Sequence, residues 1–204
     1  MIELFGHPTQ NVLKAQILLE ELGIEYRRIN DRLLEPGSPE HDTFMQASPT
    51  GQVPALHDPQ TGAKLFESSA ILIYLAEKFG QFLPSQDTPL ERAETLKWLL
   101  FESASLTPAM LDIYHYTLQA EDEHPYSEQR ARTRSRQALN VLENRLSDGR
   151  EYFGGDYSIA DMIVYPWMVI LEDFADIPLS DYPNLEAWTT RVGQRPAVKK
   201  AEAP

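Results

Sequence analysis

Residues 48–80 constrain the fold more than any other stretch, because they combine the signals of two strands, a turn and a helix start. The first of these strands opens on Val53-Pro54 and continues into apolar Ala55 and Leu56. Most X-Pro bonds are trans, and a trans proline at an edge strand is the common arrangement. A cis bond would instead turn the N–H and C=O of Val53 into a cleft. From these residues alone, both arrangements remain open.

The end of the same stretch predicts a helix. Glu67 and Ser68 stand just ahead of apolar residues whose spacing of three and four is typical of one helix face. These apolar residues are Ile71, Leu72, Leu75 and Phe79. We expect Ser68 to be the N-cap of this helix. The free N–H groups and the dipole at such an end attract a carboxylate, but a serine there can also serve only to cap its own helix.

The charge of the chain argues against nucleic acid as a partner. Its 31 acidic residues against 18 basic ones leave a net charge of -13, which repels a phosphate backbone. The 204 residues, 42% of them hydrophobic, can bury one or two ordinary cores. Apolar runs are too short for a membrane span, and Glu3 and His7 interrupt the pattern of a signal peptide. We therefore expect a cytoplasmic protein without a membrane partner.

The chain contains no cysteine. It therefore has no disulfide, no thiolate nucleophile, no CxxC redox pair and no zinc site built from sulfur. We expect no metal centre. Any sulfur chemistry must use a thiol that a ligand brings to the protein.

The first 80 residues predict an alternating α/β unit. Residues 2–5 read as a strand, residues 12–22 as a helix ended by Gly23, and residues 25–30 as a second strand. A strand, helix and strand in this order imply a parallel pair with a right-handed crossover. Ser38-Pro39 then predicts the start of a short helix, anchored by Phe44 and Met45. Two strands and the helix near Ser68 complete the order βαβ, short α, ββα.

This order, with VPAL at residues 53–56 and ESSAIL at residues 67–72, resembles the thioredoxin-like domain of the glutathione transferase superfamily. The resemblance implies a cis Val53-Pro54 bond, so that Val53 can hydrogen-bond the cysteinyl backbone of glutathione. It also implies that Glu67 and Ser68 hold the carboxylate and amine of the γ-glutamyl group. Gln52 and Pro54, which flank Val53, are counted with the same glutathione site.

The second half of the chain predicts an all-α domain, residues 89–204, joined to a domain of residues 1–80 by a linker at residues 81–88. Residues 90–119 read as helical, with Pro108 expected to kink or divide the helix. Residues 127–146 form a second amphipathic helix. Its early turns carry Arg130, Arg132, Arg134 and Arg136. Solvated surface is the simple interpretation of these arginines, and one of them lying over an acid-binding cleft is the alternative.

Ser158 and Asp161 predict a capping box ahead of a strongly apolar run. Loss of one side of such a cap is expected to cost about 0.5–2 kcal/mol of stability. The pair also resembles the S-x-x-D signature in the C-terminal domain of the same superfamily. The resemblance therefore covers nearly the whole chain.

The catalytic group is predicted in the loop HPTQN, residues 7–11. The superfamily places a tyrosine, serine or cysteine near the end of the first strand, to bond with the glutathione sulfur. This chain has Thr9 and Asn11 instead, a pattern similar to the bacterial Nu class and to the transferase-like domain of the yeast nitrogen-regulating prion protein. Gln10 and Val12 depart from that pattern. The alternative is that Thr9 is a turn residue and Asn11 a plain N-cap.

A hydroxyl and an amide suffice energetically for thiol activation. Lowering a thiol pKa from about 8.5 to about 6.5 requires roughly 2.7 kcal/mol in favour of the thiolate. One hydrogen bond to a charged group contributes about 1.5–3 kcal/mol, and a helix N-terminus about 0.3–1 kcal/mol more. From the same resemblance, His41 and Glu102 are weaker candidate glutathione ligands, with Glu102 reaching the glutathione amine of a neighbouring subunit.

We therefore predict a glutathione-dependent enzyme that reduces small disulfides, with weak conjugation or peroxidase activity beside it. The alternatives are a conjugating transferase or isomerase, and a non-catalytic glutathione-binding regulatory module. Glutathione acts as co-substrate, a second small substrate is needed, and a homodimer is expected. Aromatic side chains at helical spacing either line the second-substrate pocket or form core. They are Tyr114, His115, Tyr116, Tyr126 and Trp167.

Overall fold

Residues 1–203 are described in a computed structural model, and their contacts divide into two compact units. The first unit contains residues 1–83 together with the chain from Arg195 onward, and the second contains residues 84–194. The final helix thus belongs to the first unit. That residues 1–80 and 89–204 are separate domains joined at 81–88 stays a prediction. Within residues 1–203, no helix is both long and apolar enough to cross a membrane.

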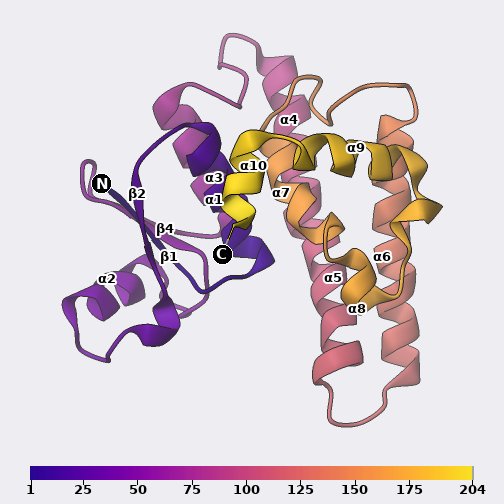
Figure 1. The fold of residues 1–204 in the computed structure, drawn as a ribbon, viewed down its shortest axis with the longest axis horizontal. Helices are drawn as coiled ribbons and strands as arrows, with labels where there is room; N and C mark the ends of the chain where they lie inside the picture. Colours follow the sequence, from indigo (N-terminus) through magenta and orange to yellow (C-terminus); the bar gives the residue numbers. More distant parts are fainter. Residues whose placement is uncertain (204) are drawn as a thin grey trace. The chain divides into compact units, whose positions relative to one another are not determined.

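The first unit is built on a four-stranded sheet (Figure 1). Its strands are β1 (Ile2–Phe5), β2 (Tyr26–Ile29), β3 (Ala55–Asp58) and β4 (Ala63–Phe66), in the order β2-β1-β3-β4. β1 pairs parallel with β2, as predicted, and the other two pairings are antiparallel. The Val53-Pro54 bond is cis. The alternative of a trans proline at an edge strand is therefore wrong, since β3 also lies between β1 and β4.

Four helices complete this unit, and the last of them packs against the first. They are α1 (Gln10–Glu21), α2 (Pro39–Ala47), α3 (Ser68–Phe79) and α10 (Pro196–Glu202). Phe5 and its register partner Ala55 form a core cluster with Phe44 of α2. Neighbouring strand residues point to opposite faces, so Leu4 and Leu56 lie toward α1 and α3, which pack against each other (Figure 1).

Helix boundaries follow local signals. Gly23, at φ 65°, follows the end of α1 as predicted. Ser38 caps α2 by accepting from His41 N at 3.2 Å, with Pro39 in the first turn. Met45 is 38% exposed, so the prediction that it anchors α2 beside Phe44 is wrong. Adjacent helix positions face different directions, and the core is on the Phe44 side.

Asp58 ties the end of β3 to α3. Its buried carboxylate accepts from Tyr74 Oη at 2.6 Å, from Gln60 N at 3.0 Å and from the Lys78 ammonium. Burial opposes ionisation, but hydrogen bonds from Lys78, Tyr74 and Gln60 outweigh it and lower the pKa of Asp58 to about 2. The charged form is therefore the one that the folded state favours.

We expect Asp58 to contribute about 2 kcal/mol to the free energy of unfolding. Its folded pKa lies below the unfolded value, so the contribution is present above about pH 4 and is lost as the pH falls toward 2. Urea unfolding of Asp58→Asn and wild type at pH 7, 4 and 3 checks this, with the exposed Asp122→Asn as control. The difference between wild type and Asp58→Asn should shrink with decreasing pH; a constant difference would contradict the assignment.

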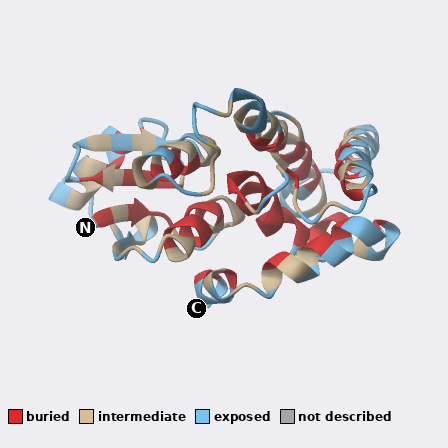
Figure 2. Ribbon diagram, turned by 90° about the horizontal axis from the view of Figure 1, so that it is seen from above, coloured by how far each residue is buried: buried red, intermediate tan, exposed pale blue. Residues whose placement is uncertain are grey.

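The second unit is helical. Its helices are α4 (Pro89–Phe101), α5 (Thr107–Tyr114), α6 (Pro125–Leu146), α7 (Ile159–Met168), α8 (Leu171–Ala175) and α9 (Pro183–Gly193), with π-helical turns at Glu102–Leu106 and His115–Gln119. The first π-helical turn ends at Leu106, two residues before Pro108 in the first turn of α5. Proline has no N–H for the carbonyl four residues back, so the predicted division occurs here. Buried and exposed residues face opposite sides of most helices (Figure 2).

The arginines of α6 differ from one another. Arg130 and Arg136 are exposed, as the surface interpretation predicts. Arg132 is partly buried and donates to Glu128 and to the carbonyl oxygen of Ala175, and Arg134 pairs with Asp112 at 2.8 Å. Arg136, although exposed, pairs with Asp181 at 3.5 Å, so three of the four arginines connect α6 to other helical segments of this unit.

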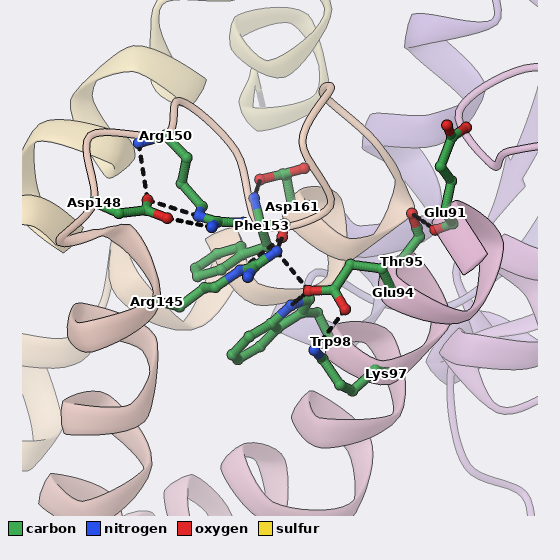
Figure 3. Close-up of polar contacts among 10 residues, drawn as sticks. All are labelled: Glu91, Glu94, Thr95, Lys97, Trp98, Arg145, Asp148, Arg150, Phe153 and Asp161. Atoms are coloured by element: carbon green, nitrogen blue, oxygen red, sulfur yellow. Dashed lines mark hydrogen bonds and ion pairs between the residues drawn. The ribbon is translucent and has the colours of Figure 1, made fainter.

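The predicted capping box at the start of α7 is present. Asp161 is fully buried and accepts from Ser158 N at 3.0 Å, Phe153 N at 3.1 Å and Trp188 Nε1 at 2.9 Å. Arg145 donates to the carbonyl oxygen of the same Phe153 and pairs with Glu94 of α4 at 2.5 Å (Figure 3). Asp161 thus caps α7 and also binds the loop at Phe153 and helix α9 through Trp188.

Candidate functional site

Three loop segments meet at one end of the sheet. Phe5 pairs with Ala55, and Ala55 pairs with Phe66. The residues that follow β1, precede β3 and follow β4 therefore lie beside one another at this end. They are Gly6 to Thr9, Val53-Pro54 and Glu67-Ser68. The sheet register thus brings together the predicted catalytic loop and both predicted glutathione-binding motifs.

Gly6 allows these segments to approach closely. A Cβ atom at this position would lie 2.4 Å from Cγ2 of Val12 and 3.4 Å from Cβ of Val53. No side chain fits in that space, so only glycine lets the loop pass between α1 and the Val53 segment. Asp31 holds the other side of the loop, because its Oδ1 accepts from His7 N at 2.7 Å and lies 2.9 Å from His7 Nδ1. Gly6 and Asp31 are not among the site residues that the sequence predicts.

Thr9 is the N-cap of α1. Its Oγ1 accepts from Val12 N at 3.2 Å. A hydroxyl that accepts in this way still carries a proton to donate. Asn11 is inside the first turn of the helix, so the alternative in which Asn11 is the N-cap is wrong. The first turn of α1 contains no acidic residue, which leaves the positive end of the helix dipole unopposed by its own side chains.

The Val53 segment is shaped by Ser48, a buried serine that is not among the predicted site residues. Ser48 Oγ donates to the carbonyl oxygen of Gln52 at 2.8 Å, and Gly51 N donates to Ser48 O at 2.9 Å. Val53 is partly buried against the Phe5 cluster, whereas Gln52 is exposed. A serine beside a Pro-Thr-Gly sequence is the signal that could have identified this turn.

Glu67, and not Ser68, is in the N-cap position of α3, and Ser68 is the first helical residue. This corrects the predicted cap by one residue. Glu67 is exposed, has φ 69° and ψ 116°, and makes no side-chain cap bond. A positive φ in a residue other than glycine costs about 1–3 kcal/mol and persists where the surroundings impose it, often at ligand sites. The uncapped helix end faces the same end of the sheet as Thr9.

The two weaker candidates do not join this cluster of segments. The His41 ring has a local contact, Gly37 N to Nδ1 at 3.5 Å, which gives no support to a ligand role, and that assignment stays a prediction. Glu102 is fully buried and accepts from Trp167 Nε1 at 2.9 Å and from Thr107 Oγ1. The carboxylate is thus enclosed within the helical unit of its own chain. These contacts give no support to a ligand role for Glu102, and that assignment stays a prediction.

Among the five aromatic candidates, Trp167 is core, since it is 4% exposed. Tyr114, His115 and Tyr126 are exposed, and Tyr116 is partly buried. Within residues 1–203, no group of three or more His, Cys, Asp or Glu side chains is arranged to hold a metal ion.

Two family models match the chain. The glutathione S-transferase N-terminal domain matches residues 1–77. The glutathione S-transferase C-terminal domain matches residues 106–196. The matched ranges contain all three segments of the site and the capping box.

Individual proteins resemble the chain over nearly its whole length. The disulfide-bond oxidoreductase YfcG of Escherichia coli is 38% identical, over 98% of this chain and 94% of that protein. A Pseudomonas putida glutathione transferase, solved with one glutathione disulfide per subunit, has 33% identity and a TM-score of 0.86, covering 100% of this chain and 91% of its own. Ure2p, the yeast prion protein, solved with glutathione, has 27% identity and a TM-score of 0.86, covering 98% and 92%.

Proposed function

Because the chain belongs to the glutathione S-transferase family, we propose that it binds glutathione where the Thr9, Val53 and Glu67 segments meet and uses the glutathione thiolate to reduce small disulfides. YfcG is named a disulfide-bond oxidoreductase, and the P. putida relative was solved with glutathione disulfide. The resemblance to Ure2p agrees with the predicted subgroup. Glutathione is the co-substrate in this proposal.

Each part of the site has its own task. The backbone of Val53 pairs with the cysteinyl residue of glutathione, and the uncapped end of α3 with Glu67 and Ser68 holds the γ-glutamyl group. The Thr9 hydroxyl and Asn11 amide donate to the sulfur. The thiolate then attacks one sulfur of a disulfide RSSR, forming GS–SR and releasing RS⁻. A second glutathione thiolate attacks the mixed disulfide to give glutathione disulfide and the second RS⁻.

The observation that carries this proposal is the state of Thr9. Its oxygen accepts from Val12 N at 3.2 Å, and its proton remains available to an acceptor ahead of the helix. A protein without cysteine needs such a donor, because the thiol comes from the ligand. Together with the dipole of α1, one charge-assisted hydrogen bond supplies roughly the 2.7 kcal/mol that a shift of two pKa units requires.

Retention on glutathione resin, followed by an assay with bis(2-hydroxyethyl) disulfide and excess glutathione, tests the function. We expect retention and glutathione-dependent turnover. Ser68→Ala should weaken glutathione binding by roughly tenfold or more, because a hydrogen bond to a charged group is lost. Retention without turnover would favour the non-catalytic module. Turnover of an aryl halide electrophile, with none of the disulfide, would favour the conjugating transferase.

We also propose a homodimer. Leu90, Leu100 and Leu111, on α4 and α5, are 85%, 55% and 47% exposed. Phe101 and Val141 line a hollow of about 250 Å³ on the same unit. Large exposed apolar side chains of this kind favour association. Sedimentation at micromolar concentration should give twice the chain mass of 23.3 kDa, and a single 23.3 kDa species would contradict the dimer.

A cytoplasmic location belongs to the same proposal. Disulfide reduction by this route consumes two molecules of reduced glutathione per disulfide, and the cytosol maintains a reducing glutathione pool.

A further inference from the structure

Lys14 is a buried cation in the second turn of α1. It is 1% exposed, and its Nζ donates to Asn11 Oδ1 at 2.8 Å. Lysine is almost never fully buried unless it is paired, because removing its charge from water is costly. Its position three residues after Asn11 places it on the same face of the helix. The predicted catalytic function makes no use of this residue.

The contact determines which way the Asn11 amide is turned. An ammonium group carries three donors and no acceptor, so only the carbonyl oxygen of Asn11 can face it. The amide nitrogen, with its two hydrogens, therefore points away from Lys14. Without this partner the amide can rotate by half a turn and present its oxygen where its nitrogen had been. A donor to an anionic sulfur would then become a repelling acceptor.

We propose that Lys14 is a positioning residue for the thiolate of bound glutathione: its ammonium holds Asn11 with the Nδ2–H groups toward the sulfur. The inference rests on the proposed function.

Titration of the ultraviolet thiolate absorbance of bound glutathione tests the inference. Lys14→Met, which keeps the length and apolar stem, should raise the thiol pKa by about one unit and slow disulfide reduction about tenfold at neutral pH. The KM for glutathione should change much less, because the peptide is held at Val53 and Ser68. Lys14→Arg should restore most of the lost ionisation. If methionine prevents folding, Lys14→Gln carries the same expectation, since its side chain is too short to reach Asn11.

The Asn11→Ala background separates positioning from a simple charge effect. In the Asn11→Ala background, Lys14→Met should raise the thiol pKa little further, because the amide that Lys14 orients is gone. A full additional shift in that background would overturn the positioning role, as would a Lys14→Met titration that overlaps the wild-type curve. In both cases the wild type would still ionise its bound thiol. Failure of the proposed function looks different, because bound glutathione in the wild type would then titrate like free glutathione.

Discussion

Replacing Thr9 by valine should slow glutathione-dependent disulfide reduction by about ten- to a hundredfold. Valine keeps the shape of threonine and removes the hydroxyl, whose oxygen accepts from Val12 N and whose proton is available to the sulfur. A hydrogen bond to a charged group contributes about 1.5–3 kcal/mol, and 1.36 kcal/mol corresponds to one decade in rate. Glutathione affinity should fall much less, because Val53, Glu67 and Ser68 hold the peptide.

The pH profile separates loss of the donor from loss of the cap. Thr9→Val and Asn11→Ala should each raise the pKa of the bound thiol. If both side chains donate to one sulfur, the pKa shift in the double mutant should be smaller than the sum of the two single shifts. Thr9→Ser keeps the hydroxyl and should retain the wild-type profile. Overlapping titrations of wild type and Thr9→Val would remove Thr9 from the mechanism.

A matched cap elsewhere in the same unit controls for stability. Ser38 accepts from His41 N at 3.2 Å, the same geometry that Thr9 has with Val12 N. Ser38→Ala therefore reports the cost of losing a cap alone, about 0.5–2 kcal/mol. Thr9→Val should lose a similar free energy of unfolding. If Thr9→Val lost much more free energy of unfolding than Ser38→Ala, its slower disulfide reduction would reflect unfolding of the protein.

Asp161→Ala should destabilise the protein by about 3–5 kcal/mol, more than the loss of a cap, because three buried N–H donors lose their acceptor. These donors belong to Phe153, Ser158 and Trp188. Burial raises the pKa of Asp161 to about 6, while the hydrogen bonds from Trp188, Phe153 and Ser158 favour its charged form. At pH 7.5 the carboxylate is therefore ionised and accepts from all three.

Urea unfolding at pH 7.5 measures this loss, with turnover of the folded fraction recorded beside it. Asp161→Asn keeps the shape and one acceptor oxygen, so it should lose less stability than alanine. The exposed Asp122→Asn, which makes no comparable contact with the core, is the control for a changed carboxylate and should unfold like the wild type. If Asp161→Ala abolished turnover at an unchanged melting temperature, Asp161 would have to be assigned to the site.

Short-range signals predicted most of the fold. The strands around Val53 and the helix after Glu67 depend on residues a few positions apart, as do the caps at Ser38 and Ser158, so the sequence carries them directly. Thr9 and Asn11 are predicted as the sulfur donors because the chain has no cysteine and no serine before Ser38, and because the loop resembles that of the related subgroup. The N-cap of α3 was predicted one residue too late, at Ser68 instead of Glu67. Glutamate rarely adopts a positive φ, so the sequence gives no signal for the φ of 69° that Glu67 has at the cap.

The amino-acid sequence by itself determined the family, the order of elements and the three segments of the proposed site. Only the tertiary structure decided which side chains are enclosed and what they touch. Glu102 and Trp167 became partners inside the helical unit although 65 residues separate them. Gly6 became a contact point for Val12 and Val53, and Lys14 became buried beside Asn11. The physical reason is that burial and partner choice depend on sheet register and helix packing, which bring together residues with no local signal of one another.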